Sequence, residues 1–228
     1  MFITFEGPEG SGKTTQIQLL ADTLREEGRE VVTTREPGGV PAAEQLRELV
    51  LHGELYPETE ALLFLAARAE HARALIRPAL ERGAVVVCDR FNDSTIAYQG
   101  CGLGLDIETL RGLCRFAAAG LAPDLTVLLD LDPETGLRRR LPAYDGEAGQ
   151  LHLEMDVPAE NTAGAQSVNR MENRELEFHR RVRAGFLTEA ERDPQRIYVV
   201  NAGKSVKQVQ QAVWREVRRR LRTGGSGT

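Results

Sequence analysis

The sequence has few cysteines and no long apolar run. Cys88, Cys101 and Cys114 lie far apart, with no C-x-x-C pair and no histidine at metal-ligand spacing, so we predict neither a disulfide framework nor a zinc site. No apolar segment approaches the roughly 20 residues that a membrane-spanning helix needs, and no charged-then-apolar leader precedes the first predicted strand. We therefore expect a cytoplasmic protein with no membrane partner.

Positive charge is also in short supply. The 29 Lys and Arg residues are outnumbered by 34 Asp and Glu residues, and a net charge of −5 argues against a nucleic-acid partner, because nucleic-acid binding needs a basic face. With 41% hydrophobic and 28% charged residues, the 228-residue chain has the composition of one globular domain. We predict a single domain over residues 1–222 and a flexible polar tail over 223–228.

The most specific motif lies near the start of the chain. Residues 7–14, GPEGSGKT, fit the phosphate-loop pattern G-x-x-x-x-G-K-[ST] between an apolar run and a helical pattern. Glycine backbones let successive N–H groups turn toward phosphate oxygens, Lys13 can reach the β- and γ-phosphates, and the Thr14 hydroxyl can ligate Mg²⁺. We predict that a polyphosphate, expected to be ATP, binds to Gly7, Pro8, Glu9, Gly10, Ser11, Gly12, Lys13, Thr14 and Thr15.

The periodicity after this loop alternates between strands and helices. We predict strands over residues 2–5, 31–34, 84–89, 125–131 and 197–200, and helices over 14–27, 42–51, 58–82 and 206–221, with Pro78 kinking or restarting the third helix. Near-continuous apolar strands separated by helices indicate a parallel sheet covered on both faces. The predicted fold is therefore a three-layer α/β/α P-loop NTPase fold.

One segment breaks this rhythm. Residues 141–168 hold Gly, Pro, Ala and five acidic residues but no Lys or Arg, whereas arginines precede them at 138–140 and follow them at 170 and 174. We predict a mobile lid over about residues 138–170 that carries this acidic insertion. The alternative, a solvated charged loop, remains open for most of the segment.

Charged residues at predicted strand ends are candidates for the chemistry. Asp89 ends a buried strand and could orient Mg²⁺, although it could also cap the next turn; Arg90 follows as a candidate phosphate clamp. Arg35 and Arg47 together suggest a second phosphate group, although each alone fits a solvated surface residue better. We interpret His52, His71, His152 and His179 as surface or structural residues.

Four linked motifs carry a resemblance to a known family. Residues 7–15, 34–39 (TREPGG), 63–71 (LFLAARAEH) and 89–100 (DRFNDSTIAYQG) resemble, in this order and spacing, bacterial thymidylate kinase. The resemblance implies transfer of the ATP γ-phosphoryl group to dTMP, giving dTDP and ADP, with Mg²⁺ as cofactor and with a homodimer as the assembly.

The resemblance also implies roles for single residues. Phe64 would stack on the thymine ring and Arg68 would donate to a thymine carbonyl, whereas the residues alone would favour Phe64 as core and leave Tyr98 undecided. The remaining implied contacts are those of Thr95 and Gln99 with the base, Tyr98 with the sugar, Glu9 with the sugar hydroxyl or the acceptor-side network, and Arg35, Arg47 and Arg90 with the monophosphate.

The chain departs from some members of that family at Gly10. Where those members carry an arginine in the phosphate loop, this chain has glycine, so the transition-state charge must be met from elsewhere. Members with a small residue there bring arginines from the lid, and the candidates are Arg138, Arg139, Arg140 and Arg170.

Two other functions remain open from the residues. A different small P-loop kinase would share the phosphate loop but not the pocket around Phe64, Arg68 and Gln99. A nucleotide-dependent switch belongs to a different class; it is disfavoured because the sequence has no D-x-x-G or N-K-x-D guanine pattern.

Overall fold

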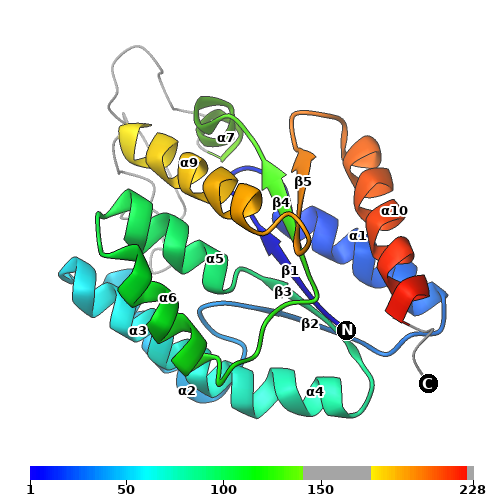
Figure 1. Ribbon diagram of the computed structural model, residues 1–228, viewed down its shortest axis with the longest axis horizontal. Helices are drawn as coiled ribbons and strands as arrows, with labels where there is room; N and C mark the ends of the chain where they lie inside the picture. The colour runs from blue at the N-terminus through cyan, green and yellow to red at the C-terminus, as the bar shows by residue number, and fades with distance from the viewer. Residues whose placement is uncertain (141–175, 225–228) are drawn as a thin grey trace, which may run out of the picture.

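A five-stranded parallel sheet forms the centre of the molecule. The computed structural model describes residues 1–140 and 176–224, so most of the predicted lid and residues 225–228 of the predicted tail lie outside the described residues. The strands are β1 (Phe2–Glu6), β2 (Val31–Arg35), β3 (Val85–Asp89), β4 (Leu125–Asp130) and β5 (Ile197–Asn201), in the order β2-β3-β1-β4-β5 (Figure 1). The predicted α/β fold is confirmed.

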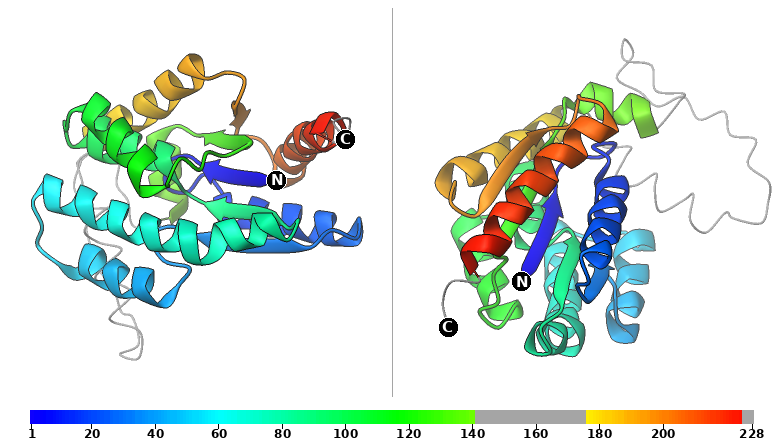
Figure 2. Two further views of the ribbon diagram at one scale, coloured as in Figure 1. Left: turned by 60° about the horizontal axis from the view of Figure 1, so that its bottom comes forward. Right: turned by 90° about the vertical axis from the view of Figure 1, so that its right-hand side faces the viewer.

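Helices cover both faces of this sheet (Figures 1 and 2). On one face, α1 (Lys13–Glu26) and α10 (Val206–Gly224) pack on strand residues such as Ile3 and Phe5. On the other face, Phe2 and Leu128 pack against the helical segments η1 (Ala72–Ile76), α4 (Arg77–Glu81), η2 (Ile96–Gly102) and α9 (Leu176–Arg192). The alternation of Phe2 with Ile3 shows why the strands are apolar on both sides.

A second group of helices lies beyond η2. Here α3 (Pro57–His71) packs against α2 (Pro41–His52) and against α6 (Ile107–Ala117). Ala61, Leu65, Leu110 and Cys114 form a small apolar cluster between α3 and α6. This cluster fixes α3 beside the segment that follows β3.

The long helix predicted over residues 58–82 is wrong in detail. It consists of α3, the π-helical turn η1 and α4, which begins at Arg77, one residue before Pro78. The restart at Pro78 is therefore confirmed, but the π-helical turn was not predicted. Helical structure was also not predicted in α5 (Asn92–Thr95), η2, α6, α7 (Pro133–Arg140) and α9.

The sheet register brings three predicted site segments to one edge. Phe5 pairs with Asp89, and Asp89 pairs with Arg35. The carboxyl ends of β1, β2 and β3 therefore lie together, which is where open α/β sheets bind ligands.

None of the helices within residues 1–140 and 176–224 is long and apolar enough to cross a membrane.

Candidate active site

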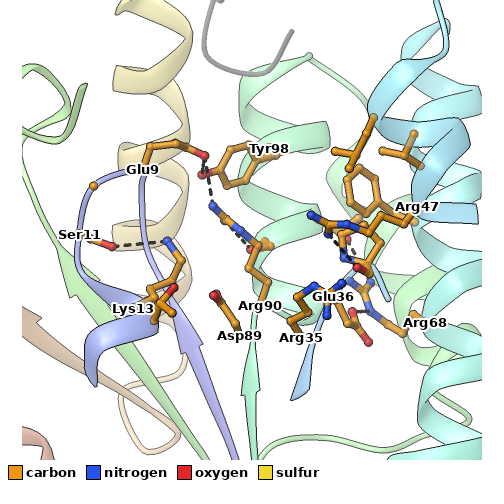
Figure 3. Close-up of a pocket in the computed structure, with 18 of the residues that line it drawn as sticks. Glu9, Ser11, Lys13, Arg35, Glu36, Arg47, Arg68, Asp89, Arg90 and Tyr98 are labelled. Atoms are coloured by element: carbon orange, nitrogen blue, oxygen red, sulfur yellow. Dashed lines mark hydrogen bonds and ion pairs between the residues drawn. The ribbon is translucent and has the colours of Figure 1, made fainter. Parts of the chain in front are cut away.

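A cavity of about 580 Å³ opens at this edge of the sheet (Figure 3). The predicted residues that line it are Glu9, Gly10, Ser11, Gly12, Lys13, Thr14, Thr15, Arg35, Arg47, Phe64, Arg68, Asp89, Arg90, Thr95, Tyr98, Gln99 and Arg139. Arg138 is exposed and does not line the cavity, whereas the side chain of Arg140 and all of Arg170 lie outside the described residues. One cavity therefore collects both the phosphate-loop residues and the residues to which the resemblance assigns base contacts.

The phosphate loop has the backbone that its glycines predict. Gly7, Gly10 and Gly12 have φ values of 136°, 68° and 87°, which other residues rarely adopt. Lys13 Nζ donates to the carbonyl oxygens of Gly7 at 2.9 Å and Pro8 at 3.0 Å, so these two residues hold the lysine without lining the cavity. Burial, helped by the nearby Arg90 charge, lowers the pKa of Lys13 to about 8.

The helix α7 lies directly on this loop. A side chain at Gly10 would overlap the carbonyl oxygen of Gly136, and a side chain at Gly136 would overlap the carbonyl oxygen of Glu9. Arg139 of α7 donates to the carbonyl oxygens of Gly10 at 3.5 Å and Ala202 at 3.1 Å. An arginine at position 10 is incompatible with this packing, which explains why this chain carries glycine there.

Glu9 projects from the loop toward the other half of the cavity. Its Oε1 accepts hydrogen bonds from Tyr98 at 2.7 Å and Arg90 at 3.1 Å, and its Oε2 lies 3.6 Å from Nδ1 of the buried His179. Burial alone would raise the pKa of Glu9, but His179, Arg90 and Lys13 together hold this pKa well below its usual range. The residue is therefore a carboxylate at neutral pH.

Arg90 lies between Lys13 on one side and Arg35, Arg47 and Arg68 on the other (Figure 3). Its φ of 70° is unusual for a residue other than glycine, and this backbone turn follows β3 immediately. Its guanidinium lies 4.8 Å from the centre of the Tyr98 ring and donates to Ser94 Oγ at 3.1 Å. Burial lowers the pKa of Arg90, but Tyr98 and the nearby carboxylates outweigh burial and raise this pKa, so the residue stays charged.

A second buried carboxylate fixes the chain after Arg90. Glu6 Oε1 accepts hydrogen bonds from the backbone N–H groups of Phe91 at 2.7 Å and Ser94 at 3.3 Å, and Oε2 is bonded to Ser94 Oγ. Burial and the nearby Asp93 charge raise the pKa of Glu6 to about 8. Glu6 therefore anchors the turn that aims Arg90 into the cavity.

Two arginines on the opposite wall face each other. Arg35 donates to Glu44 at 3.0 Å, and Arg47 donates to the carbonyl oxygen of Pro37 at 2.9 Å. Burial and the Arg35 charge lower the pKa of Arg47. An anion bound between the two guanidinium groups would relieve this repulsion, which is the electrostatic character of a phosphate site.

Arg68 is buried at the far end of the cavity. Its Nε donates to Glu36 Oε2 at 2.7 Å, and the other oxygen of Glu36 is 3.0 Å from His71 Nδ1. Its Nη1 donates to Thr95 at 3.0 Å and its Nη2 donates to the carbonyl oxygen of Phe91 at 3.0 Å. These hydrogen bonds therefore fix the plane of the Arg68 guanidinium group.

The sequence reasoning missed the residues that position the others. These are Glu6, Glu36 and Glu60, all of which are buried, whereas His71 and His179, interpreted as surface or structural residues, are buried beside Glu36 and Glu9. One signal was available for Glu60: it precedes Phe64, Arg68 and His71 at spacings of four, four and three residues, which places all of them on one stripe of α3. A buried charged residue on such a stripe indicates a polar partner.

Comparisons with known proteins agree with this geometry. Residues 5–144 match the family model described as thymidylate kinase. The chain is 52% identical over 224 residues to the thymidylate kinase of Thermomicrobium roseum, which covers 98% of this chain and 97% of that one, and 44% identical to that of an Exiguobacterium species, with 99% and 97% covered. The crystal structure of thymidylate kinase from Ehrlichia chaffeensis superposes with a TM-score of 0.71 at 35% identity, covering 96% of this chain and 98% of that one.

The lowered pKa of Lys13 predicts a pH-dependent affinity for ATP. Above pH 8 the free lysine is mostly neutral, and a bound polyphosphate favours its charged form, so binding at pH 9 should take up a proton and weaken by up to about tenfold per pH unit. Calorimetric titration at pH 7 and pH 9, in buffers of different ionisation enthalpy, measures this uptake.

The matched control is Lys13→Arg, which stays charged at both pH values. Glu6 also has a pKa of about 8 and is unchanged in this variant, so the comparison separates proton uptake by Lys13 from proton uptake by Glu6. Proton uptake should disappear in this variant. Equal affinity at both pH values with no proton uptake by the wild type would contradict the prediction.

Proposed function

The chain belongs to the thymidylate kinase family, and we propose that its cavity carries out that family's reaction, the transfer of the ATP γ-phosphoryl group to dTMP, giving dTDP and ADP. The observation that supports this most directly is a single cavity lined by a phosphate loop at one end and by Phe64, Arg68 and Gln99 at the other. Donor and acceptor would meet between these ends, and holding them in line is the main requirement of phosphoryl transfer.

The donor phosphates would bind to residues 7–15. All three bonds of Lys13 Nζ are to the loop itself, to Gly7, Pro8 and Ser11. A bound polyphosphate would take over at least one of these bonds, because a phosphate oxygen carries more negative charge than a backbone carbonyl oxygen. Lys13 is thereby held ready for the β- and γ-phosphates.

Asp89 and Thr14 would hold Mg²⁺. Both line the cavity, and Asp89 Oδ1 is buried without a hydrogen-bond partner among the described residues. The described part of the chain contains no group of three or more His, Cys, Asp or Glu side chains that could hold a metal. This fits an ion bound by one carboxylate, one hydroxyl, water and phosphates. The ion would neutralise charge on the phosphates.

The acceptor would lie across the other half of the cavity. Phe64 is half-buried and offers an apolar face to the base, with Arg68, Thr95 and Gln99 at the base edge. Tyr98 and Glu9 would face the sugar, because their mutual hydrogen bond lies between the loop and the base-side residues. Arg35, Arg47 and Arg90 would bind the monophosphate, and Arg90 would also stabilise the transferred group.

Arg139 is the lid-base arginine that we assign to the phosphates. It lines the cavity and already contacts the phosphate loop, whereas Arg138 on the same helix is exposed outside it. Because Gly10 provides no cation, the charge that develops on the transferred group would be met by Arg139, with Arg140 and Arg170 as further contributors.

A panel of monophosphates tests the reaction. We expect dTMP to give the highest kcat/KM among dTMP, dUMP, dCMP and dAMP in a coupled ADP assay with ATP, and no turnover when Mg²⁺ is withheld. The control variant Lys13→Ala should lose turnover but still bind dTMP, because the acceptor residues lie outside the loop. Turnover of dTMP no faster than that of the other monophosphates would rule out the assignment.

Replacement of single arginines tests the lid-base assignment. Arg139→Ala should lower kcat on the order of 10³-fold, as for other charge-stabilising arginines, with the Kd for dTMP nearly unchanged. Arg138→Ala is the matched control and should stay near the wild-type rate. The assignment is wrong if the two variants lose equal activity or if Arg139→Ala keeps the wild-type rate; Arg140→Ala and Arg170→Ala complete the series.

We also propose that two copies of the chain associate through the helices α2, α3 and α6. These neighbouring helices expose Leu49, Leu62 and Phe116, which are 56%, 57% and 84% exposed. Sedimentation should give twice the chain mass of 25.2 kDa, and Phe116→Asp should shift the protein to a monomer. Val206→Asp, at an exposed apolar position on α10, is the control; a wild-type monomer would exclude the dimer.

The proposal also places the enzyme in the cytoplasm, which cell fractionation would check.

A further inference from the structure

A hydrogen bond between two buried side chains lies behind the base end of the cavity. Gln99 of η2 lines the cavity, is 2% exposed and donates from Nε2 to Oε1 of Glu60 at 3.0 Å. Glu60 lies on α3 and is 1% exposed. The two residues are separated by 39 positions in the chain, so their contact depends on the packing of α3 against η2.

The hydrogen bond to Glu60 decides which way the Gln99 amide points. An amide has a donating end and an accepting end, whereas an ionised carboxylate only accepts. The donating Nε2 must therefore face Glu60, since the reverse orientation would set the amide oxygen against a carboxylate in a buried place. The carbonyl oxygen of Gln99 is then the end of the amide that remains for a ligand.

Arg68 provides the complementary group. A guanidinium has five N–H groups, and those of Arg68 donate to Glu36, Thr95, Cys114 and Phe91. Among the described residues, this leaves one N–H of Nη2 without an acceptor. The base end of the cavity therefore presents one fixed donor, from Arg68, and one fixed acceptor, from Gln99.

We propose that Glu60 is a specificity-determining residue, which acts by holding the Gln99 amide with its oxygen toward the base. This inference rests on the proposed function. Thymine offers a carbonyl oxygen at position 4 and an N–H at position 3, which match the Arg68 donor and the Gln99 acceptor. Cytosine offers an amino group at position 4 and a bare nitrogen at position 3, so both of its contacts would be mismatched.

The isosteric variant Glu60→Gln tests this orientation. A neutral amide can accept or donate, so Gln99 would be free to turn and donate to N3 of cytosine, although the contact of the cytosine amino group with Arg68 would stay mismatched. We expect the ratio of kcat/KM for dTMP over dCMP to fall by about tenfold or more, the usual size of a discrimination that depends on one or two buried hydrogen bonds. Glu58→Gln, the same change at an exposed position of α3, should leave the ratio unchanged.

Two further variants separate orientation from mere support of the fold. Glu60→Asp keeps the carboxylate charge, so it should lower the rates with both substrates while retaining most of the ratio. In a Gln99→Ala background, Glu60→Gln should change the ratio no further, because Glu60 acts through Gln99. Melting temperatures of all variants identify any that are unfolded. If Glu60→Gln is unfolded, the Glu60→Asp variant and the double variant provide the test.

The outcomes distinguish the inference from the function on which it rests. If the wild type prefers dTMP but Glu60→Gln lowers both substrates equally, or if Glu60→Asp loses the ratio as fully as Glu60→Gln, Glu60 does not set the preference. If the wild type itself shows no preference for dTMP over dCMP, the proposed function fails, and this inference fails with it.

Discussion

One buried carboxylate, that of Glu9, joins the three segments that form the cavity. It belongs to the phosphate loop, accepts hydrogen bonds from Arg90 and Tyr98 after β3, and faces His179 of α9. Removal of this carboxylate would leave the buried Tyr98 hydroxyl and one N–H of Arg90 without this acceptor, which is more unfavourable than the loss of a single hydrogen bond. The positions of Arg90 and Tyr98 relative to the loop therefore depend on Glu9 being charged.

The other cations of the cavity fall into two groups, according to whether a buried carboxylate neutralises them. Arg68 is paired with Glu36 and kept in a fixed plane, which suits the recognition of a flat base. Arg35 and Arg47 instead repel each other, and among the described residues the one ion pair of Arg35 is with the half-exposed Glu44. Under the proposed function, the excess positive charge of this pair would attract the monophosphate, and the buried Glu36 would keep Arg68 for the base.

Sequence reasoning succeeded where the structural cause is local. The β1 strand, the phosphate loop and α1 follow one another within 26 residues, and the three glycines of the loop take the positive φ values that the motif requires. It failed at η1, because apolar spacing does not distinguish an α-helix from a π-helical turn. It also left Arg138, Arg139 and Arg140 equivalent, since only the packing of Gly136 on Gly10 brings Arg139 to the loop.

The class of fold and the shape of the phosphate loop therefore follow from the amino-acid sequence alone, because backbone angles, strand periodicity and loop motifs are set by residues close together in the chain. The tertiary structure alone decided which carboxylate lies against which donor. Glu6 meets a backbone N–H 85 positions away and Glu60 meets an amide 39 positions away. Such pairs form only when the strand order β2-β3-β1-β4-β5 and the packing of α3 on η2 bring their atoms within hydrogen-bonding distance.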